Sequence, residues 1–306
     1  MDEGRARSRV RVPRGMADRA REFAAAGLRP AVPRDAATVI LVRPETETAG
    51  VEVYLLLRTQ ALEFAPGACV FPGGSVDARD ADPGIAETGW AGPDPADFGH
   101  LLGVPADRAR ALVCAAVRET FEESGVLLAG PSPAELVPDS ADLAQDRRAL
   151  LDGSLSLSEL LSRRGLLLRA DLLTPWARWI TPEVSPRRYD TWFFAAALPA
   201  GQLAGLALAD QLAGPASAGP GESDSGTWWR PSAALEAARA GQITLLPPTA
   251  VTLGELAGHP DVPAILARRQ VITPRLPKVI VEDGRVRLAL PQSGRQSGPQ
   301  SGEERA

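Results

Sequence analysis

Length, composition and charge place this chain among ordinary folded proteins and exclude several functional classes. It has 306 residues, of which 44% are hydrophobic and 23% are charged, which is enough to bury one substantial core. A net charge of −5 excludes a protein that coats nucleic acid, because that function needs a basic surface. Two cysteines and two histidines do not build a disulfide framework or a zinc site of familiar spacing. The sequence holds no apolar run of membrane-spanning length. We therefore expect a cytoplasmic protein that binds neither nucleic acid nor a membrane.

The first third of the chain predicts an arm, a hairpin and a loop. Residues 1–34 are Arg-rich without an apolar segment, so we expect a flexible N-terminal arm. Residues 36–43 and 52–58 are two β-branched, apolar runs around a polar connection, which predicts a β-hairpin. After the turn-rich FPGGSVD at 71–77, residues 81–104 are rich in Asp, Gly and Pro and lack periodicity, which indicates an insertion loop.

The remainder mixes helices and strands. Residues 105–124 predict a long helix, with proline at its start and Gly125 in the position that ends it. A helical insert is expected at about 131–170, and Asp283-Gly284 between alternating apolar residues predicts a second hairpin. Residues 291–306 have the composition of a disordered tail. Without a regular βαβ alternation, these elements predict an α+β or αβα layered fold.

Three carboxylates crowd the end of the long helix. Glu119, Glu122 and Glu123 stand at i, i+3 and i+4 and therefore share one face, opposite an apolar stripe. Their mutual repulsion, and the negative end of the helix dipole, make this arrangement unfavourable by itself. A hard divalent cation such as Mg²⁺ reverses both effects, because it takes oxygen ligands. The competing interpretation is a solvated acidic face.

Two neighbouring features favour the metal site. Arg118 lies four residues before Glu122, close enough to pair with it and fix its conformation. Upstream, Gly73 and Gly74 allow the backbone to approach a phosphate or a metal-bound carboxylate closely.

With these residues in place, the chain resembles the Nudix hydrolases. The family signature is Gly, five residues, Glu, seven residues, then Arg-Glu-apolar-x-Glu-Glu-x-Gly-apolar, and RETFEESGV at 118–126 matches its second half. Gly74 fits the opening glycine, Asp80 stands where Glu is usual, and a long insertion replaces the seven-residue gap. This split motif is similar to a branch that includes a peroxisomal coenzyme A diphosphatase. The resemblance implies a Nudix-type αβα sandwich with a mixed sheet, as a single domain over 35–290 with C-terminal helical and hairpin additions.

The resemblance also implies roles for individual residues. Glu119, Glu122 and Glu123 become ligands of Mg²⁺ or Mn²⁺. Glu119 and Glu123 are also the catalytic candidates, and the role of Glu119 is either metal ligand or general base. Gly73, Gly74, Asp80, Arg118 and Gly125 become structural residues of the motif. The family often adds an acidic ligand from a distant loop, for which Glu222 is the first candidate and Asp224 the second; for Glu222 a solvated loop acid is the alternative.

The substrate implied is a nucleoside diphosphate linked to another group. The coenzyme A branch has an upstream pattern whose spacing fits Arg58, Gly67 and 71–74, but Glu63 replaces its second arginine. A carboxylate there would repel the 3′-phosphate of coenzyme A. Arg58 is the candidate from this pattern, and Arg187 and Arg188 are further candidates to contact phosphate. Three alternatives stay open: hydrolysis of coenzyme A or acyl-CoA, hydrolysis of a dinucleotide or nucleotide sugar, and a non-catalytic Nudix-fold binding or regulatory module. A homodimer is one assembly considered.

Overall fold

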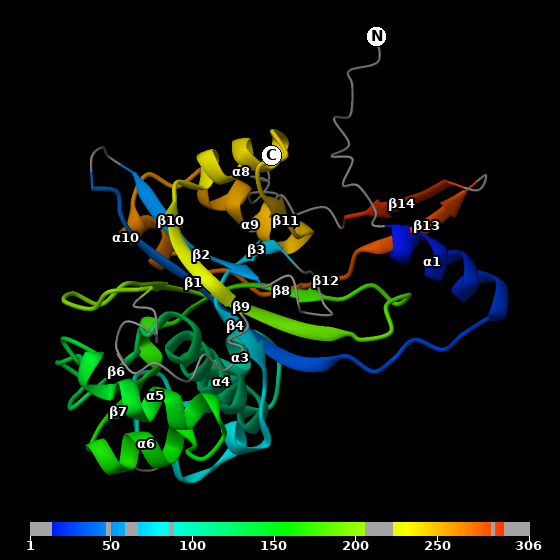
Figure 1. Ribbon diagram of the computed structural model, residues 1–306. Coiled ribbons are helices and arrows are strands. Elements are labelled where there is room, and N and C mark those ends of the chain that lie inside the picture. Colours follow the sequence, from blue (N-terminus) through cyan, green and yellow to red (C-terminus); the bar gives the residue numbers. More distant parts are fainter. Residues whose placement is uncertain are drawn as a thin grey trace, which may run out of the picture.

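A mixed β-sheet with helices on both faces forms the centre of the molecule (Figure 1). The structure is a computed structural model, and it describes residues 14–46, 50–58, 67–85, 89–205, 223–282 and 285–290. The layered α+β architecture is the one that the sequence predicts.

The sheet is built around the predicted hairpin. Strands β1 (Arg34–Pro44) and β2 (Val51–Arg58) pair antiparallel, with Val42 opposite Val53. β1 is buried along most of its length, which explains its continuous apolar run. It pairs parallel with β9 (Tyr189–Ala197) and antiparallel with the short β4 (Gly73–Ser75). The strand order is β11 (Thr244–Leu245), β3 (Ala68–Val70), β2, β1, β9, β8 (Thr174–Ile180) and β12 (Pro274–Arg275), while β10 (Ser223–Trp229) pairs with β2.

One face of the sheet carries the long helix and the inserts, seen in the lower half of Figure 1. The helices there are α3 (Pro95–Leu102), α4 (Ala106–Ser124), α5 (Ala144–Leu151) and α6 (Leu157–Arg164). A small sheet of β5 (Trp90–Ala91), β7 (Leu167–Arg169) and β6 (Ala129–Gly130) joins them, with 3₁₀ helices η1 (Ala78–Ala81), η2 (Ala141–Leu143) and η3 (Ala170–Leu172). Helices α5 and α6 lie within the range 131–170, for which a helical insert is expected. The range 81–104, expected to be a loop, instead contains α3.

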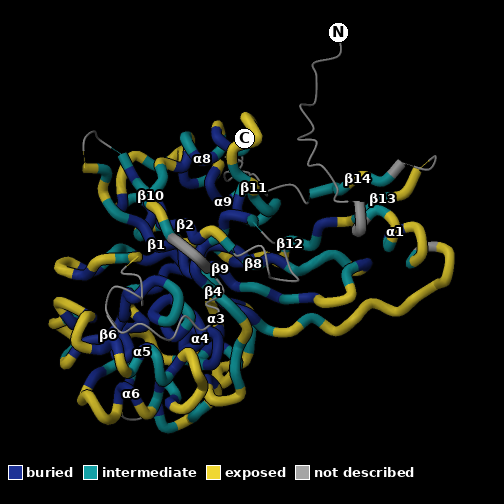
Figure 2. Tube along the Cα trace, viewed as in Figure 1, coloured by how far each residue is buried: buried dark blue, intermediate teal, exposed yellow. Residues whose placement is uncertain are grey.

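Within the described residues, three helices cover the opposite face, in the upper half of Figure 1. They are α8 (Pro231–Arg239), α9 (Pro247–Leu256) and α10 (Val262–Leu266), and each has proline in its first turn. The sheet thus separates two hydrophobic clusters, which Figure 2 shows as buried segments on both of its sides.

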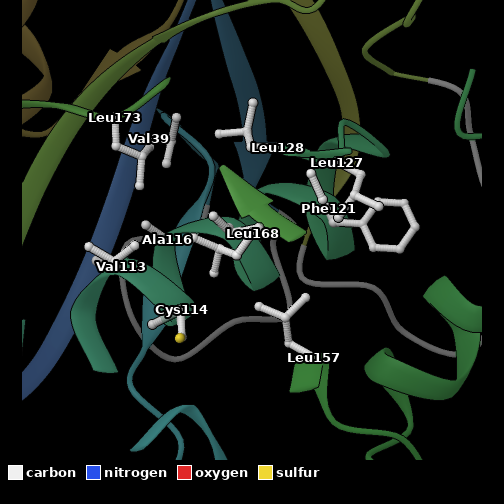
Figure 3. Packing of buried hydrophobic residues seen from close by; sticks show 14 of the residues in the cluster. Val39, Val113, Cys114, Ala116, Phe121, Leu127, Leu128, Leu157, Leu168 and Leu173 are labelled. Carbon is white, nitrogen blue, oxygen red and sulfur yellow. The ribbon is translucent and has the colours of Figure 1, made fainter. Parts of the chain in front are cut away.

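Helix α4 holds its position through an apolar stripe. It begins after Pro105 and ends at Gly125, whose φ of 78° is the left-handed conformation that glycine adopts readily. Val113, Val117 and Phe121 are fully buried, and Figure 3 shows Val113 and Phe121 in the cluster that also contains Val39 of β1. Each such side chain stabilises the fold by about 1.5–3 kcal/mol. The stripe therefore presses α4 against the sheet and turns its glutamates away from the core.

The two ends of the described chain lie close to each other. Helix α1 (Arg14–Ala26) falls within the segment expected to be a flexible arm, and it contacts β13 (Lys278–Glu282). β13 pairs with β14 (Arg285–Ala289) as the predicted second hairpin. The tail at 291–306 lies outside the described residues, and the single domain over 35–290 stays a prediction. In the described part of the chain, no helix has the length and apolar character needed to cross a membrane.

Candidate metal and diphosphate site

The two halves of the split motif meet at the last turn of α4. The backbone N–H of Gly73 donates a hydrogen bond of 2.7 Å to Oε2 of Glu123, fifty residues along the chain. A Cβ on Gly74 would lie 2.5 Å from Oε1 of Glu119, so only glycine leaves room for this carboxylate. The glycine backbone of β4 therefore faces the carboxylates of α4. The two halves of the motif meet in space although a long insertion separates them in the sequence.

A buried ion pair fixes the loop between them. Nε and Nη2 of Arg118 donate to the two carboxylate oxygens of Asp80 at 2.9 Å each, and Nη2 also donates to the carbonyl of Ser75 at 2.9 Å. Asp80 is 3% exposed and accepts a further hydrogen bond from the N–H of Asp77. This bidentate geometry specifies both position and orientation. Asp80, although shorter than the usual glutamate, still reaches the arginine.

Arg118 also contacts two of the three clustered glutamates. Its Nη1 donates to Oε2 of Glu122 at 3.0 Å, the pair expected from the i, i+4 spacing, and to Oε1 of Glu119 at 2.9 Å. One guanidinium thus serves three carboxylates, counting Asp80. The cluster keeps an excess of negative charge.

Burial, and after it the neighbouring carboxylates, raise the pKa values of these glutamates. Burial raises the pKa of Glu119 to about 7; the Arg118 charge lowers it, and the neighbouring Glu122 carboxylate raises it again. Burial likewise raises the pKa of Glu122, against the charge of Arg118. These carboxylates are poorly compensated when ionised, which is the condition that an added cation relieves.

The chemistry of these side chains fits a hard divalent cation. All the clustered donors are carboxylate oxygens, which Mg²⁺ and Mn²⁺ prefer and which differ from the nitrogen and sulfur ligands typical of zinc. Among the described residues, no group of three or more carboxylate, imidazole or thiol side chains is already arranged to hold a metal ion. Arg118 and the Gly73 N–H engage the oxygens instead. The donor set therefore fits a hard divalent cation.

Residues that the sequence did not single out hold the end of α4. Ser140 donates from its hydroxyl to the carbonyl of Gly125 at 2.6 Å, and the N–H of Gly205 donates to the carbonyl of Ser124 at 3.0 Å. Arg147 of α5 donates from Nε to the carbonyl of Glu122 at 3.0 Å. No local sequence pattern marks these partners, because they come from segments 15 to 81 residues away.

Tyr54 of β2 is a further missed neighbour of the cluster. It is 1% exposed, and burial raises its pKa to about 12, with Arg147 lowering the pKa and Glu123 raising it. The phenol therefore stays protonated at neutral pH. Its hydroxyl also occupies the space beside Gly205 and Gly226, where a Cβ would lie 2.8 Å and 1.8 Å from it.

The other predicted metal and substrate residues are only partly placed. Arg58 ends β2 opposite Ser223 of β10. Glu222 lies outside the described residues, as does Glu63, and the side chain of Asp224 is likewise not described. Their roles stay predictions.

The two adjacent arginines of the β8–β9 connection have different surroundings. Arg187 is exposed. Arg188 is 8% exposed and donates from Nε to the carbonyl of Thr181 at 3.0 Å and from Nη1 to that of Ala31 at 2.8 Å. These contacts tie the connection to the segment before β1 and not to the glutamates. The phosphate-binding role of both arginines stays a prediction.

Replacing Gly74 with alanine is expected to weaken Mn²⁺ binding while changing stability little. The new Cβ would displace the Glu119 carboxylate, and Gly74 lacks the positive φ that would strain alanine. Calorimetric titration of Mn²⁺ and thermal unfolding check the two effects. Gly254→Ala is the control, because a Cβ there has no neighbour within 4 Å. Unchanged Mn²⁺ affinity in Gly74→Ala would contradict the prediction.

Comparisons with known proteins agree with this geometry. Residues 94–256 match the family model described as the NUDT19 Nudix domain. Acyl-coenzyme A diphosphatase NUDT19 of Xenopus laevis is 28% identical over 249 residues, covering 69% of this chain and 61% of that protein. Putative nudix hydrolase 7 of Caenorhabditis elegans is 32% identical over 231 residues, covering 74% of this chain and 62% of that protein. The chain therefore spans about three-fifths of these relatives.

A solved structure supports the same fold. The crystal structure of a NUDIX hydrolase from Alicyclobacillus acidocaldarius superposes with a TM-score of 0.60 at 27% identity, covering 79% of this chain and 99% of that one. Together with a family model that spans more than half of the 306 residues, the layered fold and the split motif lead to one conclusion: this chain belongs to the family of the NUDT19 Nudix domain.

Proposed function

We propose that this chain hydrolyses the diphosphate bond of coenzyme A or acyl-CoA, using Mg²⁺ or Mn²⁺ held by Glu119, Glu122 and Glu123. The observation that carries the proposal is the partly buried, undercompensated glutamate cluster facing the Gly73-Gly74 backbone. The relative named acyl-coenzyme A diphosphatase and the spacing from Arg58 to 71–74 support this substrate.

The residues divide the chemistry among them. A cation held by these glutamates would polarise a phosphoryl oxygen and lower the pKa of water. In the other role that the family resemblance allows, Glu119 is the general base, because a carboxylate can accept the proton of the attacking water. Gly73 and Arg118 hold the carboxylates in place. Attack of the water oxygen on phosphorus breaks the P–O bond inside the diphosphate, and each product leaves with one phosphate at the broken bond.

A substrate panel tests the proposal. Purified protein is incubated with Mg²⁺ or Mn²⁺ and coenzyme A, an acyl-CoA, a diadenosine polyphosphate or a nucleotide sugar, and products are identified by mass spectrometry. Release of 3′,5′-ADP and 4′-phosphopantetheine from coenzyme A is the expected result. Absence of hydrolysis of every compound with either metal would contradict it and favour a non-catalytic binding module.

One observation favours a second candidate with the same chemistry. Glu63 replaces the arginine of the coenzyme A pattern, and its charge would repel a 3′-phosphate. A dinucleotide or nucleotide sugar lacks that phosphate. Dephospho-coenzyme A, which also lacks it, separates the two cases: faster cleavage of dephospho-coenzyme A than of coenzyme A favours the second candidate.

The stabilisation by Mn²⁺ is expected to grow as pH rises from 6 to 8. Burial raises the pKa of Glu119 from its ordinary 4.5 to about 7, so the folded, metal-free protein holds a proton that the unfolded chain releases. Its stability therefore falls as pH rises through this window. Cation binding requires the ionised carboxylate and reverses the loss. Thermal unfolding with and without Mn²⁺ at each pH measures the difference, and Glu119→Gln should flatten it. A Mn²⁺ effect that is larger at pH 6 would contradict the assignment.

A further inference from the structure

The last turn of α4, which carries Glu122 and Glu123, has no basic residue within it. The carbonyls of a helix C-terminus are unsatisfied and carry partial negative charge. Glu122 and Glu123 add full negative charge to the same turn. Such an end frays unless other segments hold its carbonyls.

Arg147, contributed by the insert between α4 and β8, supplies the missing cation. It is 6% exposed, and its Nε donates to the carbonyl of Glu122 at 3.0 Å. The carboxylates of Glu122 and Glu123 and the hydroxyl of Tyr54 are its electrostatic neighbours. Gly125 leaves space for the guanidinium, since a Cβ there would lie 3.2 Å from Nη1. The insert therefore holds the turn that carries the glutamates.

Two effects of Arg147 on a bound cation oppose each other. Its charge repels a nearby cation, whereas its hydrogen bond fixes the backbone from which Glu122 and Glu123 project. Outer contacts that orient metal ligands change metal affinity by about 10- to 100-fold. The contact is to the main-chain oxygen of a proposed ligand residue, and this geometry favours orientation over repulsion.

We propose that Arg147 is a positioning residue that sets the cation affinity of the α4 glutamates through the carbonyl of Glu122. The inference rests on the proposed function in taking Glu119, Glu122 and Glu123 as metal ligands. It assigns a role in the site to the helical insert, which lies outside the sequence motif.

The test is calorimetric titration of the full chain with Mn²⁺, without substrate. Arg147→Met is expected to bind Mn²⁺ about 10- to 100-fold more weakly than the wild type, and Arg147→Lys to recover part of the loss because an ammonium can still donate to the carbonyl. Arg169→Met is the matched control. Arg169 is 7% exposed in the same insert and, besides its ion pair with Asp171, donates to the carbonyl of Glu135, away from the glutamates. Both methionine variants lower thermal stability, but only Arg147→Met weakens Mn²⁺ binding.

A pair of glycine variants keeps the inference testable if Arg147→Met does not fold. Gly125 and Gly165 both end helices with positive φ, 78° and 62°, so alanine introduces the same backbone strain at each. At Gly165 a new Cβ meets nothing within 4 Å, whereas at Gly125 it presses on Arg147. Weaker Mn²⁺ binding is expected in Gly125→Ala alone.

The outcomes separate this inference from the proposed function. Mn²⁺ affinity in Arg147→Met or Gly125→Ala equal to, or tighter than, that of the wild type would overturn the positioning role, whatever the substrate. Failure of the wild type to cleave any diphosphate contradicts the proposed function, and the substrate panel measures it independently of the Mn²⁺ titrations.

Discussion

Glu123→Gln is expected to lower turnover on the order of 10³-fold, because a metal ligand contributes several kcal/mol to the transition state and each 1.4 kcal/mol is tenfold in rate. Glutamine keeps an oxygen that can accept the hydrogen bond from the Gly73 N–H, 2.7 Å long in the native protein. The fold should therefore remain intact while the charge is lost. Steady-state kinetics on the best substrate of the panel, together with thermal unfolding, measure both quantities.

The control for this experiment is Glu236→Gln. Glu236 is an exposed glutamate on α8, which covers the opposite face of the sheet from α4. It should leave turnover unchanged. Turnover near that of the wild type in a folded Glu123→Gln protein would show that Glu123 is not a metal or catalytic residue.

Local signals in the sequence predicted the elements that carry the site. Helix α4 lies within one residue of its expected bounds, because proline and glycine mark its ends and its apolar stripe has the helical period. The β1–β2 hairpin follows from two apolar runs around a polar connection. The pairing of Arg118 with Glu122 follows from helix geometry alone.

Contacts between distant segments were not predictable in this way. Arg147, Ser140 and Gly205 hold the end of α4 from other segments of the chain, and each looks like an ordinary residue in its own context. Helix α3 is a different case, since Asp94 caps its first turn and Pro95 begins it. That signal was available, but the surrounding glycines and prolines concealed a helix of only eight residues.

Arg118→Met is expected to reduce the free energy of unfolding by about 3–5 kcal/mol, because it leaves the buried Asp80 carboxylate without its partner. Asp80 is 3% exposed and accepts two hydrogen bonds of 2.9 Å from Arg118. Glu119 and Glu122 lose the same guanidinium. Urea denaturation of the metal-free protein measures the loss. Mn²⁺ should recover part of it, since a cation can replace the missing charge beside the glutamates.

A double-mutant cycle decides how much of this loss belongs to the ion pair. Arg118→Met combined with Asp80→Asn should cost clearly less than the sum of the two single changes, because the double variant no longer buries an unpaired charge at residue 80. Arg110→Met on the same helix removes a hydrogen bond to the carbonyl of Ala81 and should cost about 1 kcal/mol. Additive losses at Asp80 and Arg118 would show that the two side chains act independently, and that the loop before α4 is held by something other than this ion pair.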